Sequence, residues 1–600
     1  MTNRPSNDDL QPVSQKQQPQ EDFEATILVP QTSQYSQYIE ADAGDGTKAH
    51  EQYLHGLPLM LTIASCVIAL FLVALDQTIV STILTIVGEK FDSFAKIAWL
   101  TSGFSLPMAC LSPSYGKLSI AFGRKNTMIA GIIIFEIGSL ISALSTSMGM
   151  LIGGRTIQGI GGGAIQAMVM VIFTECVPIS KRSLMFASTG VVYSTASVLG
   201  PVSGGALEKI SWRWCFYINL PIGGVALAIM LWGFNPPKPK GNVREKLAKV
   251  DFIGTLLLAT GLILVLLALT FGGIDFPWNS APIIVMLIVG GIGLVLFMIW
   301  NFRFSNHPII LKEFLITPQV LAACISGMFN SAYFISNLTY LALYFQVIFN
   351  ASSFQSGIYL LPMIISVTIS SISNTIFITT TSNIKITMLL SGILSPIGTG
   401  LMLLLSTNSS LGLRIGVLIV SGIPIGLSFQ STLLAAQLVS PKSIPGALIL
   451  VTVFVNFLRN VGATVSVDLS ELLFQTTGTT YINDLIRSLP PDSPGYLALT
   501  GMTSKALISN PRLINNLPIE IQDMVLDQFM KAFKNVFYLG LGLASVCCVA
   551  SLFTTNKRIP KTKNIKTKED ENDGESGKRS ESQSNSNEST VIGAATKTGE

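Results

Sequence analysis

Two oppositely charged residues stand inside long apolar runs of this chain. Asp76 lies in VALDQTIVSTI, and Arg155 lies in LIGGRTIQGIGGG. An ionisable side chain is costly in hydrocarbon, so one that lies in a membrane-crossing segment is a candidate functional residue. Counted along the predicted segments, Asp76 lies roughly 12 Å and Arg155 roughly 8 Å from the same membrane surface, at about 1.5 Å per residue. The two side chains are therefore predicted to share one level.

The chemistry expected of such a pair is proton exchange. A carboxylate beside a guanidinium stays ionised until a substrate or a conformational change alters the contact. An Asp76–Arg155 pair can then exchange a proton for a substrate. A purely structural ion pair is the alternative interpretation.

Other polar residues in apolar runs are weaker candidates. Glu136, in IIIFEIGSLISAL, either carries protons or hydrogen-bonds to a neighbouring helix. Arg459 and Asn460 lie in NFLRNVGATVS, where Arg459 balances a carboxylate or meets an anionic group, with a structural pair as the alternative. Three uncharged residues either line a cavity or its mouth or serve as polar packing: Gln158, Gln430 and Gln437.

The composition requires elements that cross a membrane. Of the 600 residues, 49% are hydrophobic and only 12% are charged, whereas a soluble domain carries about 25% charged residues. Several apolar stretches reach the roughly 20 residues that a helix needs to span a bilayer. The sequence therefore predicts an all-α polytopic membrane protein.

Several functional classes lack their motifs. The seven cysteines show no paired spacing, and the three histidines lie outside or at the edges of the apolar segments, so no disulfide framework or metal site is predicted. No phosphate-binding loop is found, which argues against an ATP-driven pump. Gly159-x-Gly161-x-x-Ala164 resembles a dinucleotide fingerprint but lies within a predicted span, where close helix packing explains it. Neither an enzyme nor a nucleic-acid partner is expected.

Fourteen spans are predicted from the apolar segments. They lie near 59–84, 97–116, 127–147, 150–172, 184–206, 215–234, 252–272, 281–302, 319–347, 355–379, 385–406, 412–433, 446–467 and 533–553. Lys and Arg gather in alternate short loops, which are predicted to face the cytoplasm together with both termini. Asn350 and Asn408 begin sequons in outer loops and are glycosylation candidates.

The spans group as six, two and six. A bundle over 57–234 and a second over 317–553 are joined by a cytoplasmic loop and two linker helices over 235–316. A long outer loop is expected at about 468–532, and disordered cytoplasmic tails at 1–56 and 554–600, without a cleavable signal peptide. Paired bundles with a site at the midplane are a transporter architecture that permits alternating access.

A glycine-rich stretch, GVVYSTASVLGPVSGGAL, interrupts the fifth span. Gly200 and Gly204 lie four residues apart on one face, and Gly205 follows. Small residues allow close backbone contact between helices in lipid, and Pro201 removes a donor and can bend the helix. A packed, bent helix contact is predicted here.

These motifs together resemble the major facilitator superfamily, in particular its fourteen-span drug:proton antiporter branch in fungi. LDQTIVSTI is similar to that branch's motif in span 1, and GRTIQGIGGG to its motif in span 4, where the resemblance implicates Arg155 in proton transfer. GPVSGG, preceded by Gly190, resembles the antiporter motif of span 5. WRWCFYINLPIGG, residues 212–224, resembles the segment that enters span 6.

The loop between spans 2 and 3 departs from the family pattern. It reads GKLSIAFGRK, which keeps Gly116, Gly123, Arg124 and Lys125. Ile120 and Ala121 replace the usual Asp-Arg pair. In the family that Asp helps to latch one conformation, so the latch is expected to be weakened or rebuilt in this chain.

The resemblance implies a proton-coupled antiporter that exports varied small molecules, such as drugs, azoles, dyes and toxicants, across the plasma membrane. Only Asp76 and Glu136 are carboxylates well inside predicted spans, which favours this interpretation. Proton-coupled transport of Lys, Arg or His into the vacuole is the first alternative, and a membrane sensor that transports nothing is the second. A monomer driven by the proton gradient, without a cofactor, is expected.

Overall fold

The computed structural model describes residues 42–93, 96–240, 242–273, 276–490 and 493–560. All of the described residues belong to one compact unit, which carries the fold. The predicted disorder of the tails falls mostly on residues outside the described ranges. Residues 42–55 and 554–560 are exceptions, because they make defined backbone hydrogen bonds to the helical bundle.

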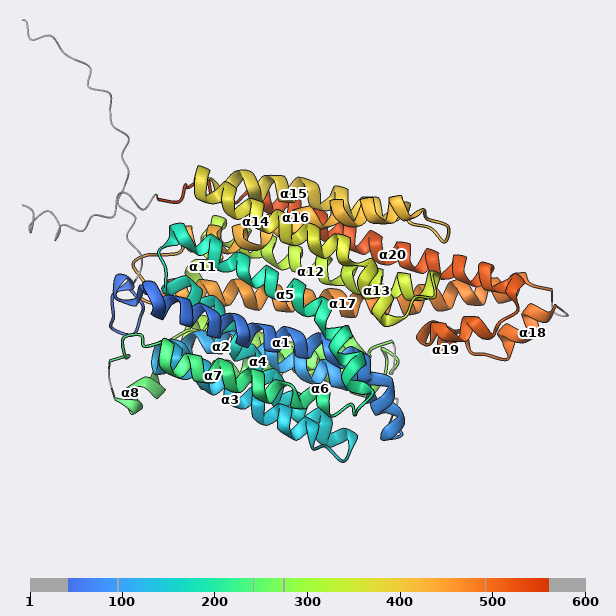
Figure 1. Ribbon diagram of the computed structural model, residues 1–600, viewed down its shortest axis with the longest axis horizontal. Helices are drawn as coiled ribbons and strands as arrows, with labels where there is room; N and C mark the ends of the chain where they lie inside the picture. The colour runs from blue at the N-terminus through green and yellow to red at the C-terminus, as the bar shows by residue number, and fades with distance from the viewer. Residues whose placement is uncertain (1–41, 94–95, 241, 274–275, 491–492, 561–600) are drawn as a thin grey trace, which may run out of the picture. The chain divides into compact units, whose positions relative to one another are not determined.

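The first bundle contains α1 (Gly56–Lys90), α2 (Ala98–Phe122), α3 (Arg124–Ala143), α4 (Met148–Glu175), α5 (Ile179–Glu208), and the short α6 (Trp214–Tyr217) followed by α7 (Asn219–Gly233). A 3-10 turn, η1 (Ala49–Gln52), precedes α1. The tightest neighbours are α3 with α4, α2 with α4, and α1 with α5 and α7. Figure 1 shows α1, α3 and α7 side by side in this bundle.

The linker contributes α8 (Val243–Ala248), α9 (Phe252–Phe271), α10 (Ala281–Ile299), the π-helical η3 (Trp300–Phe304) and α11 (Lys312–Ile316). The α9 helix packs on α10 and also contacts α2 and α17. The linker pair therefore touches both bundles.

The second bundle contains α12 (Pro318–Ile348), α13 (Ser353–Tyr359), α14 (Leu361–Thr381), α15 (Ile384–Leu401), η4 (Met402–Leu404), α16 (Leu411–Val439), α17 (Ala447–Ser488) and α20 (Ile519–Leu552). Three short elements lie between the last two: α18 (Pro494–Thr500), α19 (Ser504–Ser509) and η5 (Pro511–Asn516). The α12 helix packs on α16, α17 and α20, and α14 packs on α16.

The all-α, multi-span fold is confirmed. Twelve helices in the described part of the chain are long and apolar enough to cross a membrane. The remaining two predicted spans coincide with α2 and α12, which are 25 and 31 residues long but are not among these twelve. Both line the central cavity with residues such as Ser102, Ser105, Asn330 and Ser331, which lowers their mean hydropathy. Fourteen spans are consistent with this arrangement.

The segment predicted as a long outer loop, 468–532, is largely helical. The α17 helix runs 21 residues past the predicted end of its span at 467, and α20 begins at Ile519 rather than near 533. The extensions hold together through a buried apolar cluster that includes Phe474, Ile482 and Val525. Polar residues on the other faces of these helices interrupt the apolar run, so the sequence predicts a loop here.

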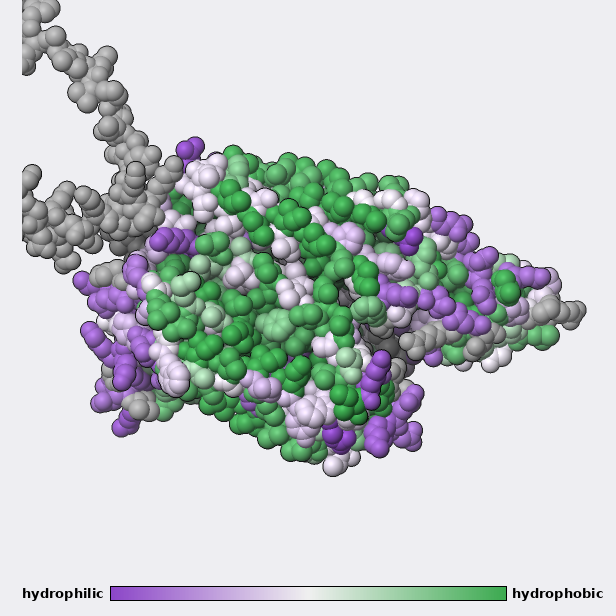
Figure 2. All heavy atoms as spheres, in the orientation of Figure 1, coloured by the Kyte–Doolittle hydropathy of each residue, from purple (hydrophilic) through white to green (hydrophobic). Residues whose placement is uncertain are grey.

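The outer surface of the bundle is apolar. Figure 2 shows a broad hydrophobic band across the face that carries α1 and α5, with hydrophilic residues toward both ends. On α10 the exposed side chains include Ile284, Ile288, Ile292 and Val295. An exposed apolar surface of this extent is the surface that a bilayer covers.

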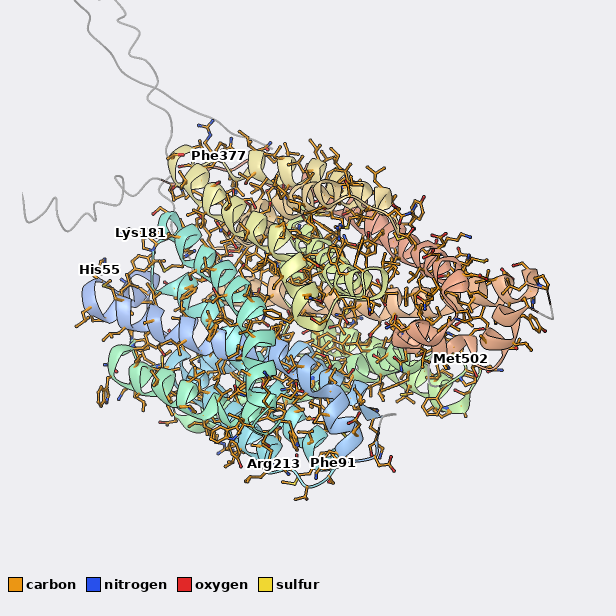
Figure 3. The ribbon with its side chains drawn as sticks, turned by 45° about the vertical axis from the view of Figure 1, so that its right-hand side comes forward. His55, Phe91, Lys181, Arg213, Phe377 and Met502 are labelled. Carbon is orange, nitrogen blue, oxygen red and sulfur yellow. The ribbon has the colours of Figure 1, made fainter. Side chains whose placement is uncertain are left out.

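The two ends of the helices differ in charge. One end, named the basic end, carries Arg124, Lys125, Lys181, Lys238 and Lys385 near helix termini. Figure 3 shows His55, Lys181 and Phe377 at this end, and Phe91 and Arg213 at the opposite end.

Candidate functional site

The Asp76 carboxylate and the Arg155 guanidinium form an ion pair between α1 and α4, as expected from their depths. Asp76 is fully buried and Arg155 is 2% exposed. Arg155 Nε also donates to the Leu100 carbonyl at 3.1 Å. Its guanidinium lies 4.4 Å from the centre of the Phe104 ring, a cation–π distance. Besides the ion pair with Asp76, two contacts with α2 therefore hold the arginine.

Two amides complete the surroundings of Asp76. Gln158 Nε2 donates to Asp76 Oδ1 at 3.0 Å and to Ser139 Oγ at 2.7 Å. Asn219 Nδ2 donates to the same Asp76 oxygen at 3.0 Å and to Ser139 Oγ at 3.2 Å. A cation and two amide donors on one carboxylate offset the cost of burying its charge. Helices α1, α3, α4 and α7 meet at this polar cluster.

Asn219 and Ser139 belong to the cluster but are not among the candidates from the sequence. Asn219 begins α7 inside the WRWCFYINLPIGG motif, so a polar residue within that motif was an available signal. Ser139 lies one helical turn after Glu136 on α3, and a buried serine gives no distinctive pattern.

Glu136 stands apart from the Asp76 cluster. Both of its carboxyl oxygens are buried without a hydrogen-bond partner. Its side chain fills the space beside Gly223 of α7, where a Cβ atom would overlap the carboxyl group. The structure therefore contradicts one of the two predicted roles of Glu136, a hydrogen bond to a neighbouring helix. The other role, proton carrying, stays a prediction.

A cavity of about 620 Å³ lies between the two bundles. Its wall is formed by α1, α2, α4, α5, α9, α12, α14, α16 and α17. Arg155 lines it, whereas the buried Asp76 does not. Away from the cavity, toward the basic end, residues 167–175, 430–438 and 447–457 are buried without a break. The described structure is thus closed at the basic end.

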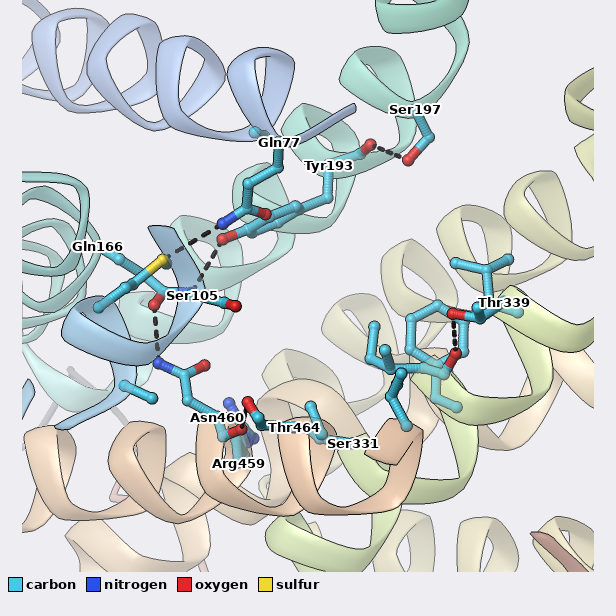
Figure 4. A pocket seen from close by; sticks show the side chains of 18 of the residues that line it. Gln77, Ser105, Gln166, Tyr193, Ser197, Ser331, Thr339, Arg459, Asn460 and Thr464 are labelled. Atoms are coloured by element: carbon cyan, nitrogen blue, oxygen red, sulfur yellow. Dashed lines mark hydrogen bonds between the residues drawn. The ribbon is translucent and has the colours of Figure 1, made fainter. Parts of the chain in front are cut away.

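A hydrogen-bonded chain crosses the cavity between the bundles. Asn460 Nδ2 donates to Gln166 Oε1 at 3.0 Å, and Gln166 Nε2 donates to the Tyr193 hydroxyl at 2.9 Å. Figure 4 shows these three side chains together with Gln77 on the cavity wall. Asn460, a predicted cavity residue, therefore faces the cavity.

Arg459 lines the cavity without a carboxylate partner among the described residues. Its Nη2 donates to the Phe429 carbonyl and to Thr432 Oγ1, and its guanidinium lies 4.6 Å from the centre of the Phe429 ring. Its Nη1 is buried and has no hydrogen-bond partner. Pairing of Arg459 with a carboxylate is therefore contradicted for the described residues, and contact with an anionic group stays a prediction.

Asp468 is a cavity residue that the sequence reasoning missed. Its Oδ1 accepts a hydrogen bond from Thr270 Oγ1 of linker helix α9 at 3.2 Å, and its Oδ2 is buried without a partner. It lies one residue beyond the predicted end of span 13. The available signal was the spacing of small and apolar residues that continues the helix at intervals of four: Ser466, Ser470, Phe474, Gly478 and Ile482.

The three glutamine candidates from the sequence lie in different surroundings. Gln158 belongs to the Asp76 cluster. Gln430 accepts from Ser183 Oγ at 3.0 Å, and Gln437 Nε2 donates to Thr174 Oγ1 at 3.0 Å. Both bonds join the two bundles on the basic side of the cavity, so these two side chains serve as polar packing.

The glycines of the GPVSGG stretch lie at different surfaces. A Cβ at Gly200 would overlap Thr78, and one at Gly204 would overlap Thr82, so α5 lies directly against α1. Gly205 faces open space, and Gly190 lines the cavity opposite Ser371 of α14. Pro201 lies inside α5, which continues through it to Glu208.

The residues of the loop between α2 and α3 lie at the basic end. Gly123 forms the corner with a φ of 92°, which favours glycine. Gly116 faces Val453 of α17, and Lys125 Nζ donates to the Leu231 carbonyl at 2.7 Å. Arg124 forms ion pairs with Glu175 and Asp45. At the opposite end, Asn350 and Asn408 lie in connections between helices.

The sequence and fold match known transporters. The family model described as Major Facilitator Superfamily matches residues 66–467. The solved structure of the human organic anion transporter MFSD10 (TETRAN) resembles the fold with a TM-score of 0.51 at 14% identity, covering 81% of this chain and 99% of that chain.

Three fungal proteins are among the similar relatives. The Vacuolar basic amino acid transporter 5 of Saccharomyces cerevisiae is 32% identical, over 88% of this chain and 96% of that protein. Azole resistance protein 1 of the same yeast is 31% identical, over 86% and 91%. Efflux pump dotC of Dothistroma septosporum is 32% identical, over 80% and 82%.

Proposed function

Because the chain belongs to the Major Facilitator Superfamily and is a membrane transporter of small molecules, we propose that it exports varied lipophilic compounds in exchange for protons. Two relatives are named for azole resistance and for efflux, which supports this substrate class. Alternating access of the cavity to the two membrane surfaces is the proposed route.

The Asp76–Arg155 pair supports this proposal most directly, because only one of its two buried side chains belongs to the cavity wall. Arg155 lines the cavity while Asp76 is sealed behind it. Uptake of a proton by Asp76 removes the charge that holds Arg155 and lets the guanidinium move into the cavity, where it weakens the binding of a substrate. Loss of the proton restores the buried carboxylate, and the return of Arg155 compensates its charge. Proton and substrate thus occupy the site alternately.

The cavity wall suits varied substrates. Its side chains include the aromatic rings of Phe104, Phe334 and Phe429 among a few polar groups. Aromatic and apolar surface binds without strict geometry, whereas sparse polar groups orient the ligand. Asp468 Oδ2, which has no partner, offers one contact for a cationic substrate.

A second candidate function is transport of basic amino acids into the vacuole. Basic substrates need carboxylates, and Asp468 of the cavity wall adds one to Asp76 and Glu136, the two that the sequence predicts inside spans. Arg459 and Asp468 both line the cavity with a polar atom that has no partner, and their opposite charges suit a substrate that carries both charges. The named vacuolar relative supports the same possibility.

The basic end is proposed to face the cytoplasm, together with both termini, because Lys and Arg collect there. The plasma membrane is the proposed location and the vacuolar membrane the alternative. The protein is proposed to work as a monomer without a cofactor, using the proton gradient alone.

Transport by purified protein in lipid vesicles tests the function. With an imposed pH gradient, we expect accumulation of the cationic dye rhodamine 6G and of fluconazole, but not of labelled lysine. Lysine transport alone would establish the second candidate. Failure to move any of the three, with correctly inserted protein, would contradict both. Localisation of a tagged protein separates the two membranes.

A further inference from the structure

Arg124 has carboxylate partners although its own loop has lost one. Where the family pattern has an Asp-Arg pair, this chain has Ile120 and Ala121. Glu175 at the end of α4 accepts from Arg124 Nε at 2.6 Å and from Nη2 at 2.8 Å. The second acid, Asp45, comes from the segment before α1. Arg124 and both acids are buried, so the set is shielded from solvent screening.

The segment that supplies Asp45 is folded in place. Residues 42–52 are named the strap. Asp45 Oδ1 accepts from the Thr47 backbone N–H at 3.0 Å, and Gln52 Nε2 donates to Thr47 Oγ1 at 2.8 Å. Gly44 and Gly46 have φ values of 79° and 89°, which allow the tight path around Asp45.

The strap joins the two bundles at the basic end. On the first bundle, Arg124 Nη2 donates to the Ala43 carbonyl at 2.9 Å. The Lys240 N–H, in the connection between α7 and α8, donates to the Asp45 carbonyl at 3.1 Å. On the second bundle, the Gly446 N–H at the start of α17 donates to the Asp42 carbonyl at 2.7 Å. The Gly44 and Gly446 backbones touch, since a Cβ at Gly44 would lie 3.0 Å from Gly446 Cα.

We propose that the strap is a latch that holds the basic end closed, with Asp45 serving as the carboxylate that Ile120 and Ala121 do not provide. For the cavity to reach the basic end, α2 and α4 must separate from α17, on which both pack, and the Gln437–Thr174 hydrogen bond between α16 and α4 must break. The strap is bonded to both sides of that seam, so opening must break its contact with Gly446 or with Arg124. Asp45 is a positioning residue for this step. The inference rests on alternating access and not on the identity of the substrate or coupling ion.

The native thiol of Cys176 reports on the latch. It lies at the basic end, 4% exposed, and its carbonyl accepts from the Leu54 N–H at 3.0 Å just after the strap. Cys548, which is partly exposed on α20, is an internal reference. In the full-length protein in vesicles, Asp45→Asn should increase maleimide labelling of Cys176 roughly tenfold relative to Cys548, because a buried ion pair is broken.

Matched variants make this test specific. Asp42→Asn is the control on the same strap, since Asp42 is exposed and contacts Gly446 through its carbonyl. It should leave labelling unchanged, and Asp45→Glu should restore most of the protection. Equal labelling of the wild type and Asp45→Asn would overturn the proposal. Removal of residues 1–52 must expose Cys176 while removal of 1–41 must not, which gives a second reading if Asp45→Asn folds poorly.

A disulfide lock separates a latch from a mere cover. A Cβ at Gly116 would lie 3.5 Å from Val453 Cβ, within the range that a disulfide spans. Gly116→Cys with Val453→Cys, oxidised, should hold α2 against α17. In combination with Asp45→Asn, the lock should return Cys176 labelling to the wild-type level. Labelling that stays high in the locked protein would show that the strap only covers the thiol, and would overturn the proposal.

Discussion

Asn219 and Gln158 give Asp76 its neutral donors, and the charged donor comes from Arg155. The pair was predictable from sequence because charged residues are rare in apolar runs and their depths matched. Neutral polar residues carry no such signal, since serine and asparagine also occur as ordinary helix packing. The network around the pair therefore had to be seen in three dimensions.

Removal of the Asn219 donor tests that network. Asn219→Leu keeps the side-chain size but leaves Asp76 with one amide donor, at a cost of about 1–3 kcal/mol for the lost contact. We expect a lower unfolding temperature in detergent and slower proton-driven transport. Ser142→Ala is the control, because Ser142 contacts Gln158 at 3.4 Å and not Asp76; an equal loss in both variants would contradict a special role of Asn219.

Asp468 is expected to select charged substrates. Asp468→Asn should reduce rhodamine 6G transport by roughly tenfold or more, because a charge-assisted contact contributes about 1.5–3 kcal/mol. Fluconazole, which is neutral, should change little. The control is Asp484→Asn on the same helix, where the carboxylate is 61% exposed in a surface pair. Equal effects on dye and azole would refute the assignment.

Helix boundaries were predictable for the helices that expose most of their surface to the lipid. The apolar runs located α9 and α10 well, since both present much of their surface outward. The extension of α17 was missed because one helical face packs against its neighbours while the other stays polar. The fold of residues 42–52 was not predictable for a different reason. This polar segment is held in place by hydrogen bonds to Arg124 and Gly446, which are distant in the sequence.

The close contact between α1 and α5 depends on Gly200, which lies against Thr78. Gly200→Ala places a methyl group into Thr78 and should cost about 1–3 kcal/mol by overpacking. Gly205→Ala meets open space and should leave stability unchanged. Thermal unfolding of the two purified variants in detergent checks the difference. Equal unfolding temperatures would contradict the close packing of α5 against α1.

Across the whole molecule, the Asp76 cluster lies within the first bundle, whereas the cavity is shared by both. Arg155 is the residue that belongs to both regions, which makes it the proposed connection between proton and substrate. The strap lies at the basic end, across the closed contact between the two bundles. It is proposed to control when the cavity opens to that end.

We propose that Asp76 couples proton movement to transport, and simultaneous recording of proton and rhodamine 6G fluxes in vesicles tests this directly. The variant is Asp76→Asn, and the control is Glu89→Gln, which changes an exposed carboxylate on the same helix. We predict that Asp76→Asn abolishes proton flux and pH-driven dye accumulation while dye exchange without a gradient persists, and that Glu89→Gln behaves as the wild type. Undiminished proton-coupled transport in Asp76→Asn would contradict the claim.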